Sequence, residues 1–251
     1  MIVLEEAPLA LVTGAARGMG AAIAVRLAQA GARVVVSDRE AATTEHTVAR
    51  IRKAGSTAWG MGLDVSDAPA CMAFAQQLRG ELGPIAILVN NAGVGGETPI
   101  DSPEAQAQWD LHIAVNLSGM FHTARAFAGA LRETRGSIVN LASLASFTAV
   151  TGSHSYMASK GGVKMLTQSL AKQFAADGIR VNAVAPGVID TPMMDRRKND
   201  AQWMAAFRTR TPMGRLGLPA EVADPVLFLV SPMAAYITGV TLPIDGGYLA
   251  T

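Results

Sequence analysis

The stretch Leu9–Gly20, LALVTGAARGMG, joins an apolar run to a turn that contains three glycines. The run Leu9–Thr13 has the length of a strand buried on both faces, and the residues after the turn, Ala21–Ala30, form a helical pattern. Glycines at a strand-to-helix turn let the backbone approach a diphosphate, and the helix N-terminus supplies free N–H groups and partial positive charge. The stretch therefore predicts the first βα unit of an α/β fold, with a dinucleotide at the turn.

The rest of the chain repeats this alternation of apolar runs and amphipathic helical segments, and no linker-like segment divides it. Runs rich in Val, Ile and Leu are typical of parallel strands covered by helices on both faces. We expect strands at Leu9–Thr13, Arg33–Ser37, Ile85–Asn90, Ser137–Leu141 and Arg180–Ala185. Helices are expected to start at Ser66 and at Ser102-Pro103-Glu104, and to end at Gly31, Gly55 and Gly83. The sequence predicts one doubly wound, Rossmann-type domain over residues 1–251.

Composition narrows the function classes. Half of the 251 residues are apolar, and the net charge of +1 argues against a nucleic-acid or anionic-membrane surface. A single cysteine, Cys71, gives neither a disulfide framework nor a Cys-based metal site. The four histidines, His46, His112, His122 and His154, lack metal-ligand spacing, so no metal is expected. The first eight residues lack the basic region of a secretory signal, and a cytoplasmic protein is expected.

The residue at the end of the second strand bears on the choice of cofactor. Asp38 lies 18 positions beyond Gly20 (38 − 20), close to the ~20-residue offset at which a carboxylate meets the adenosine ribose. A carboxylate there accepts hydrogen bonds from ribose hydroxyls and repels a 2′-phosphate, which favours NAD. Arg17 and Arg39 argue for NADP, since arginine suits a phosphate. We weight Asp38 more heavily and expect NAD.

Together with later motifs, these residues resemble the short-chain dehydrogenase/reductase family in its roughly 250-residue form, over nearly the whole chain. The glycine spacing, three residues and then one, departs from the usual dinucleotide fingerprint and fits this family. The further motifs are Asp64-Val65, Asn90-Asn91-Ala92-Gly93, Asn116, Ser143, Tyr156-Met157-Ala158-Ser159-Lys160, Pro186-Gly187 with Thr191, and Asp245-Gly246-Gly247. Each motif alone has an ordinary structural explanation, and their order and spacing together are specific.

The resemblance implies a set of cofactor-binding residues. Asp64 and Val65 would hold the adenine edge, and Thr191 with Ile189 would contact the nicotinamide amide. Lys160 would hold the nicotinamide ribose. The full set implied is Gly14, Arg17, Gly18, Met19, Gly20, Asp38, Arg39, Asp64, Val65, Asn91, Ala92, Gly93, Tyr156, Lys160, Pro186, Gly187, Ile189 and Thr191.

Four residues are expected to carry the chemistry: Asn116, Ser143, Tyr156 and Lys160. Tyr156 and Lys160 are four apart, hence on one face of a helix. A phenol titrates near pH ~10, and a nearby ammonium and an oxidised nicotinamide both lower its pKa, so Tyr156 is the proposed proton donor and acceptor. Ser143, after a strand, would hydrogen-bond the substrate oxygen. By resemblance, Asn116 supports a water that relays protons to the lysine.

Residues 188–213 contain Met193, Met194, Trp203, Met204 and Phe207, and by resemblance form a lid over the substrate. Core packing is the other explanation for these side chains. His154 is placed either to reach a substrate or to serve in a loop or helix cap. The apolar helices around Trp109–Phe127 and Val163–Phe174 suggest a homotetramer, by resemblance; packing within one monomer is the alternative.

The sequence therefore predicts an NAD(H)-dependent oxidoreductase that interconverts a secondary alcohol, a polyol or sugar alcohol among others, and its ketone. The alternative within this class is a 3-oxoacyl-thioester (acyl-carrier-protein) reductase using NADPH. A serine hydrolase built on Ser143 is disfavoured, because no Gly-x-Ser-x-Gly elbow occurs in the sequence. A regulatory protein without catalysis is disfavoured because the catalytic set is complete.

Overall fold

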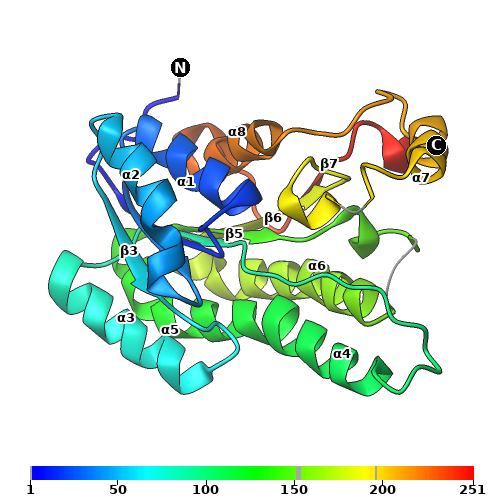
Figure 1. The fold of residues 1–251 in the computed structure, drawn as a ribbon. Coiled ribbons are helices and arrows are strands. Elements are labelled where there is room, and N and C mark those ends of the chain that lie inside the picture. The colour runs from blue at the N-terminus through cyan, green and yellow to red at the C-terminus, as the bar shows by residue number, and fades with distance from the viewer. Residues whose placement is uncertain (1, 151–153, 196) are drawn as a thin grey trace.

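A seven-stranded parallel sheet runs through the middle of the computed structural model, which describes residues 2–150, 154–195 and 197–251 (Figure 1). The strand order is β3-β2-β1-β4-β5-β6-β7, and each neighbouring pair is parallel. The strands are β1 Leu9–Thr13, β2 Arg33–Asp38, β3 Ala58–Gly62, β4 Ile87–Asn90, β5 Ser137–Leu141, β6 Arg180–Pro186 and β7 Thr241–Ile244. The strand order reverses between β1 and β4, which confirms the predicted doubly wound, Rossmann-type α/β domain.

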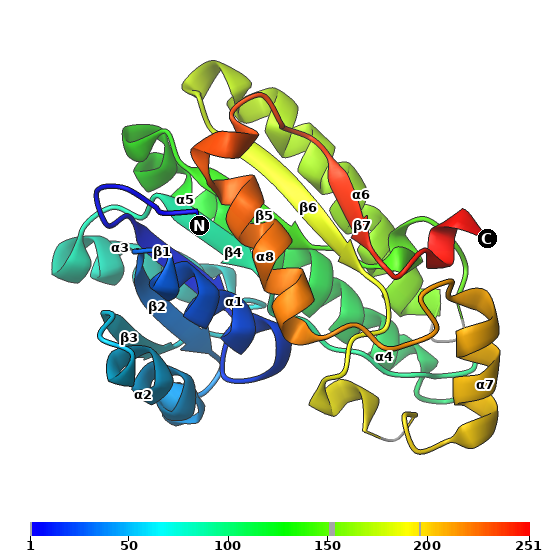
Figure 2. The same cartoon turned by 90° about the horizontal axis from the view of Figure 1, so that it is seen from above.

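Helices cover both faces of this sheet, α1, α2 and α8 on one face and α3 to α6 on the other (Figures 1 and 2). The helices are α1 Gly18–Gln29, α2 Glu45–Lys53, α3 Ala68–Leu82, α4 Ala105–His112, α5 Gly119–Thr134, α6 His154–Phe174, α7 Ala201–Arg210 and α8 Pro219–Val230. Figure 2 shows α7 and the C-terminus near the carboxyl ends of β6 and β7. This is the edge at which doubly wound folds bind ligands.

The two faces of the sheet form separate hydrophobic cores. On β1, Ala10 and Val12 pack with α1 and α8, while Leu9 and Leu11 pack with the cluster that contains Phe127 of α5. Because successive side chains of a strand point to opposite faces, a strand covered on both faces is apolar at most positions. The apolar run Leu9–Val12 of β1 follows from this packing.

The expected strands are present with ends shifted by up to two residues. The apolar pattern did not predict β3 or β7. β3 has the sequence AWGMG, with two glycines, and β7 has TLPI, with a proline and no fully buried residue. Both are edge strands, where burial on two faces no longer dictates a run of Val, Ile and Leu.

Two predicted helix starts were wrong. Asp67, not Ser66, caps α3: its carboxylate accepts from the Ala70 N–H at 2.9 Å. The Ser102 hydroxyl accepts from the Glu104 N–H in a turn, and α4 begins only at Ala105. The three predicted helix ends are confirmed, since Gly31, Gly55 and Gly83 follow α1, α2 and α3 with φ of 103°, 84° and 97°.

A chain of buried side-chain hydrogen bonds ties the centre of the sheet to two helices. The Asn90 amide donates to Asn140 at 2.9 Å, and the Asn140 amide donates to Thr167 of α6 at 3.0 Å. On the other side, the Thr123 hydroxyl of α5 donates to Asn90 at 2.7 Å. Buried polar groups left without partners cost about 1–3 kcal/mol each, so this chain sets α5 and α6 relative to β4 and β5.

Candidate active site

The glycine turn between β1 and α1 packs directly against the segment that follows β4. Gly14 and Gly18 have φ of +62° and +60°, which favours glycine. A Cβ at Gly14 would lie 2.7 Å from the Ala92 Cα, and a Cβ at Gly20 would collide with the Asn91 side-chain amide. The turn leaves the N-terminus of a 12-residue helix at the carboxyl edge of the sheet. These features fit the diphosphate of a dinucleotide.

Asp38, the last residue of β2, is held against this turn. Its carboxylate accepts from the Ala16 N–H at 3.1 Å and from the Arg39 N–H at 2.9 Å. Arg17 is exposed, and the Arg39 guanidinium is exposed and lies 3.8 Å from Glu40. The structure thus fixes a negative charge beside the turn, while both predicted arginines have exposed side chains.

Asp64 and Val65 follow β3 at the same edge. The Ser66 hydroxyl donates to the Asp64 carboxylate at 2.6 Å, and this bond holds the pKa of that carboxyl below its usual value against the opposing effect of burial. Val65 is buried, and a Cβ at Gly119 of α5 would lie 2.7 Å from its side chain. The charge of Arg39 also lowers the pKa of Asp64, so these two predicted residues interact electrostatically.

The remaining predicted cofactor residues follow β4 and β6. Gly93 borders the Lys160 ammonium, with a Cβ placed there lying 3.7 Å from Nζ. At the end of β6, a Cβ at Gly187 would lie 2.8 Å from the Asp245 Cα. A Cβ at Gly18 would lie 3.6 Å from the Thr191 side chain, so the segment after β6 reaches the glycine turn. The residues predicted from scattered motifs therefore converge around the switch point between β1 and β4.

The four expected catalytic residues meet beside this convergence. Ser143 follows β5 and is hydrogen-bonded through its side chain to the Tyr156 phenol. The Lys160 ammonium donates to the Leu141 carbonyl at 2.7 Å and lies 5.9 Å from the centre of the Tyr156 ring. Tyr156 and Lys160 are both on α6, as their spacing predicted.

Asn116 lies where the long helix changes its winding. Between α4 and α5 the residues Ile113–Ser118 form a π-helical turn, η2, a feature often found at functional sites. The buried Asn116 amide donates to the Val94 carbonyl at 3.0 Å and to the Ser159 hydroxyl at 3.2 Å, and its oxygen accepts from the Val94 N–H at 2.8 Å. Asn116 therefore joins the loop after β4 to α6, a role that the sequence did not predict.

Burial shapes the titration of the two ionisable residues. Burial lowers the pKa of Lys160 to about 8. Burial also raises the pKa of Tyr156, and the Ser143 hydrogen bond acts in the opposite direction. In the protein alone, the effect of burial is the larger of the two. The lowering expected from the Lys160 ammonium together with an oxidised nicotinamide stays a prediction for the protein with its cofactor bound.

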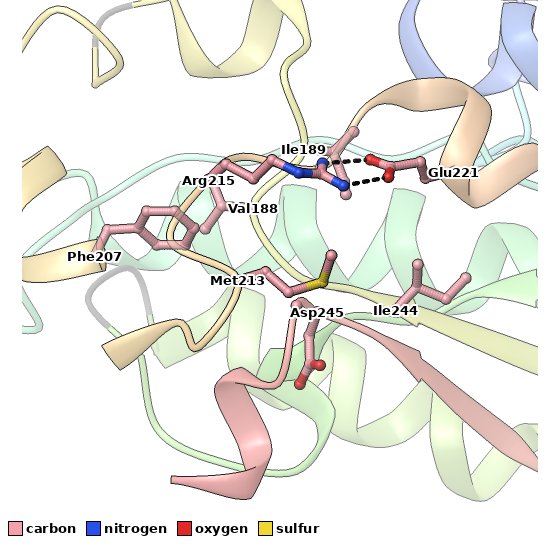
Figure 3. Close-up of a pocket in the computed structure, with 10 residues that line it drawn as sticks. Val188, Ile189, Phe207, Met213, Arg215, Glu221, Ile244 and Asp245 are labelled. Carbon is pink, nitrogen blue, oxygen red and sulfur yellow. Dashed lines mark hydrogen bonds and ion pairs between the residues drawn. The ribbon is translucent and has the colours of Figure 1, made fainter. Parts of the chain in front are cut away.

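Two hollows have linings that contain none of Ser143, Tyr156 and Lys160. The first, about 430 Å³, is lined mainly by apolar residues between β6, α7 and β7 (Figure 3). At its rim Arg215 binds both carboxylate oxygens of Glu221, at 2.8 and 2.6 Å (Figure 3). The second, about 310 Å³, is lined by Thr98, Ile100, Ala105, Trp109, His154 and Ser155. His154 thus lines a hollow two residues from Tyr156.

The predicted lid, residues 188–213, lies against the loop that follows β4; position 196 within it is outside the described residues. A Cβ at Gly95 would lie 3.2 Å from the Met193 sulfur, and Arg197 forms an ion pair with Glu97. In α7, Trp203 stacks on the buried Phe207, with ring centres 5.5 Å apart. Some of the apolar side chains therefore pack against one another within α7.

The described residues also bear on two other kinds of site. They contain no group of three or more His, Cys, Asp or Glu side chains placed to hold a metal ion. Among their helices, none combines the length and the apolar character needed to cross a membrane.

The fold and the site together define an NAD(P)-dependent oxidoreductase. The sequence model of a family described as enoyl-(acyl carrier protein) reductase matches residues 14–249. A galactitol 2-dehydrogenase (L-tagatose-forming) from Cereibacter sphaeroides is 41% identical, over 95% of this chain and 94% of that protein. A 3-oxoacyl-[acyl-carrier-protein] reductase from Vibrio harveyi is 38% identical, over 96% and 97%.

Among solved structures, a gluconate 5-dehydrogenase from Burkholderia cenocepacia J2315, in complex with NADP and tartrate, superposes with a TM-score of 0.94. It is 34% identical, and the match covers 99% of this chain and 97% of that chain. The chain belongs to the short-chain dehydrogenase/reductase family, as its motifs indicated. It is an oxidoreductase that acts on CH–OH groups.

The buried lysine gives a stability prediction. Between pH 8 and 10.5 the unfolded chain keeps a proton on Lys160 that the native protein has lost, so stability rises with pH, by up to about 1.4 kcal/mol per pH unit from this group. Urea unfolding across this range should show a shallower rise for Lys160→Met than for the wild type. The matched change at the exposed Lys172 of the same helix should keep the wild-type slope; equal slopes for all three proteins would contradict the burial argument.

Proposed function

We propose that this protein is an NAD(H)-dependent dehydrogenase that interconverts a secondary alcohol, of the polyol or sugar-alcohol type, and its ketone. The observation that carries the proposal is the cluster of Ser143, Tyr156, Lys160 and Asn116 beside the glycine turn. The Cereibacter relative, named for a polyol substrate, supports the substrate class.

Tyr156 acts as the acid/base. In the oxidative direction its phenolate takes the proton of the substrate hydroxyl, and Ser143 orients that oxygen through its own hydroxyl. In reduction the phenol returns the proton to the carbonyl oxygen. Lys160 holds positive charge near the phenol, and its nearness to Gly93 supports a role at the cofactor ribose. Asn116 holds the loop after β4 and α6 in register. Its further role is to support a water that relays protons to Lys160.

The cofactor is held by the residues around the switch point: the glycine turn with Arg17 and Met19, Asp38 with Arg39, Asp64 with Val65, Asn91 to Gly93, and the residues after β6. When bound, nicotinamide supplies the hydride acceptor, and its oxidised ring supplies positive charge. That charge acts against the burial that raises the pKa of Tyr156. The protein's own residues contribute alignment and proton transfer.

Residues 188–213 are proposed to close over the substrate. Met193 beside Gly95 and the Arg197–Glu97 ion pair support this, because they join the lid to the loop after β4. A homotetramer is proposed as the assembly. Large apolar side chains exposed on α4, α5 and α6 support it, among them Trp109 at 43%, Phe121 at 47% and Met165 at 60% exposure.

Removing the phenol oxygen tests the acid/base assignment. Tyr156→Phe keeps the ring and its packing, so NADH binding, measured by fluorescence titration, should stay within about threefold of wild type. Turnover of secondary alcohols should fall by about 10²–10⁴-fold, the range of general acid/base catalysis. The change Tyr248→Phe, outside the cluster, should keep both values. Wild-type turnover in Tyr156→Phe would refute the assignment.

The cofactor preference depends on Asp38. Asp38→Ser removes the charge that opposes a 2′-phosphate, and the ratio of kcat/KM for NADP to that for NAD should rise by about tenfold or more. Asp67→Ser, at the start of α3, is the matched change and should leave the ratio as it was. A ratio unmoved by Asp38→Ser would remove the main support for NAD.

The second candidate is an NADPH-dependent 3-oxoacyl-thioester reductase. Arg17 and Arg39 support it, since both have exposed side chains next to the groups that hold Asp38. The relative from Vibrio harveyi supports it as well. A higher kcat/KM with NADPH than with NADH, together with reduction of a 3-oxoacyl thioester, would make the protein a reductase of this second class.

A further inference from the structure

A fully buried histidine lies beside Tyr156 and is not used in the proposed chemistry. His112, the last residue of α4, has no exposed surface. Its ring meets the Tyr156 ring edge to face, with centres 5.8 Å apart and planes at 73°. A polar ring with two nitrogen atoms is costly to bury without partners, so its contacts define what it does.

Two side chains, one on α6 and one on α4, hydrogen-bond to the His112 ring. Nδ1 lies 2.7 Å from the hydroxyl of Ser155, the residue that precedes Tyr156 in the first turn of α6. Nε2 lies 3.0 Å from the side-chain amide of Gln108, one turn earlier in α4. The Gln108 amide in turn packs against the loop after β4, because a Cβ at Gly96 would lie 3.0 Å from its nitrogen.

The neutral ring suits this environment. Burial, and secondly the charge of Lys160, lower the pKa of His112, while the Gly95 backbone acts in the opposite direction. A neutral imidazole has one N–H and one lone pair. With the hydrogen on Nδ1 the ring donates to the Ser155 hydroxyl, and the Nε2 lone pair accepts from the Gln108 side-chain amide. An aliphatic or phenyl side chain in its place has neither group.

Resting on the proposed function, we propose that His112 is a positioning residue: it fixes the Tyr156 ring, through Ser155 and through ring contact, relative to Gln108 and the Gly95–Gly96 segment of the loop after β4. Substrate bound against that loop is then presented to the phenol oxygen at a set distance. Displacement of a reacting group by about 1 Å costs about 10²-fold in rate. Because His112 links the loop after β4 to Tyr156, its loss should lower kcat rather than the affinity for the cofactor.

Two variants separate packing from hydrogen bonding. His112→Phe keeps a ring against Tyr156 and loses both polar contacts. His112→Asn places an amide near the position of Nδ1 and keeps the Ser155 contact. We expect kcat to fall by about 10–100-fold in His112→Phe and to recover to within about fivefold of wild type in His112→Asn. The KM for NAD should stay within about twofold in both. His46→Phe, at an exposed histidine of α2, is the matched control and keeps wild-type kcat.

A second readout needs no turnover. The phenolate absorbance of Tyr156 is the difference between the titrations of the wild type and of Tyr156→Phe. For His112→Phe, it is the difference from the double variant that carries both His112→Phe and Tyr156→Phe. The groups that face this phenol are Ser143, His112 and Lys160. Burial raises the pKa of Tyr156. His112→Phe removes the contact that holds Ser155, so we expect the first turn of α6 to loosen, Tyr156 to gain contact with water, and its titration to move toward the ordinary value of about 10.

Measured together, kcat and the titration of Tyr156 distinguish failure of the positioning role from failure of the proposed function. Unchanged kcat or unchanged Tyr156 titration in His112→Phe overturns the positioning role, and so does a loss that His112→Asn shares in full. A wild-type protein that turns over no secondary alcohol, yet shows the shifted titration in His112→Phe, overturns the proposed function and leaves the positioning of Tyr156 supported.

Discussion

The ammonium of Lys160 is buried at the carboxyl end of β5, where it donates to the Leu141 carbonyl. Such a charge is costly to bury, and the cost appears as a pKa lowered to about 8. Lys160 stays buried because hydrogen bonds hold α6 in place from two sides. Asn140 holds Thr167 from the sheet, and Asn116 holds Ser159 from the π-helical turn. The positions of Tyr156 and of the loop after β4 follow from the same contacts.

The parallel sheet explains why distant motifs form one site. Each strand delivers its last residues to the same edge, and the reversal of strand order between β1 and β4 leaves room there for a ligand. Gly14 and Gly20 can pack against Ala92 and Asn91 because they lack a Cβ, which at either position would collide with that segment. The glycines thus serve packing and ligand approach together.

The sequence predicted the fold and family well because burial on both faces gives the inner strands an unmistakable apolar pattern. The strands β3 and β7 lack that pattern and were not predicted from it, because edge strands are less buried. The four residues of the cluster were identified by resemblance, and the structure brings them together; their roles stay predictions. The π-helical turn, and His112 at the crossing of three segments, depend on tertiary contacts that residue spacing does not encode. The rise that burial causes in the pKa of Tyr156 could not be read from a four-residue spacing.

In the proposed reaction the cluster takes the hydroxyl proton of an alcohol while a hydride leaves the carbon that bears that hydroxyl. Stopped-flow mixing of the protein and NAD with a panel of secondary polyols tests this, with NADH formation and release of protons to a pH indicator followed together. At least one polyol should give NADH, with one proton released for each NADH formed. NADH formation from none of the polyols, or formation without matching proton release, would contradict the proposal.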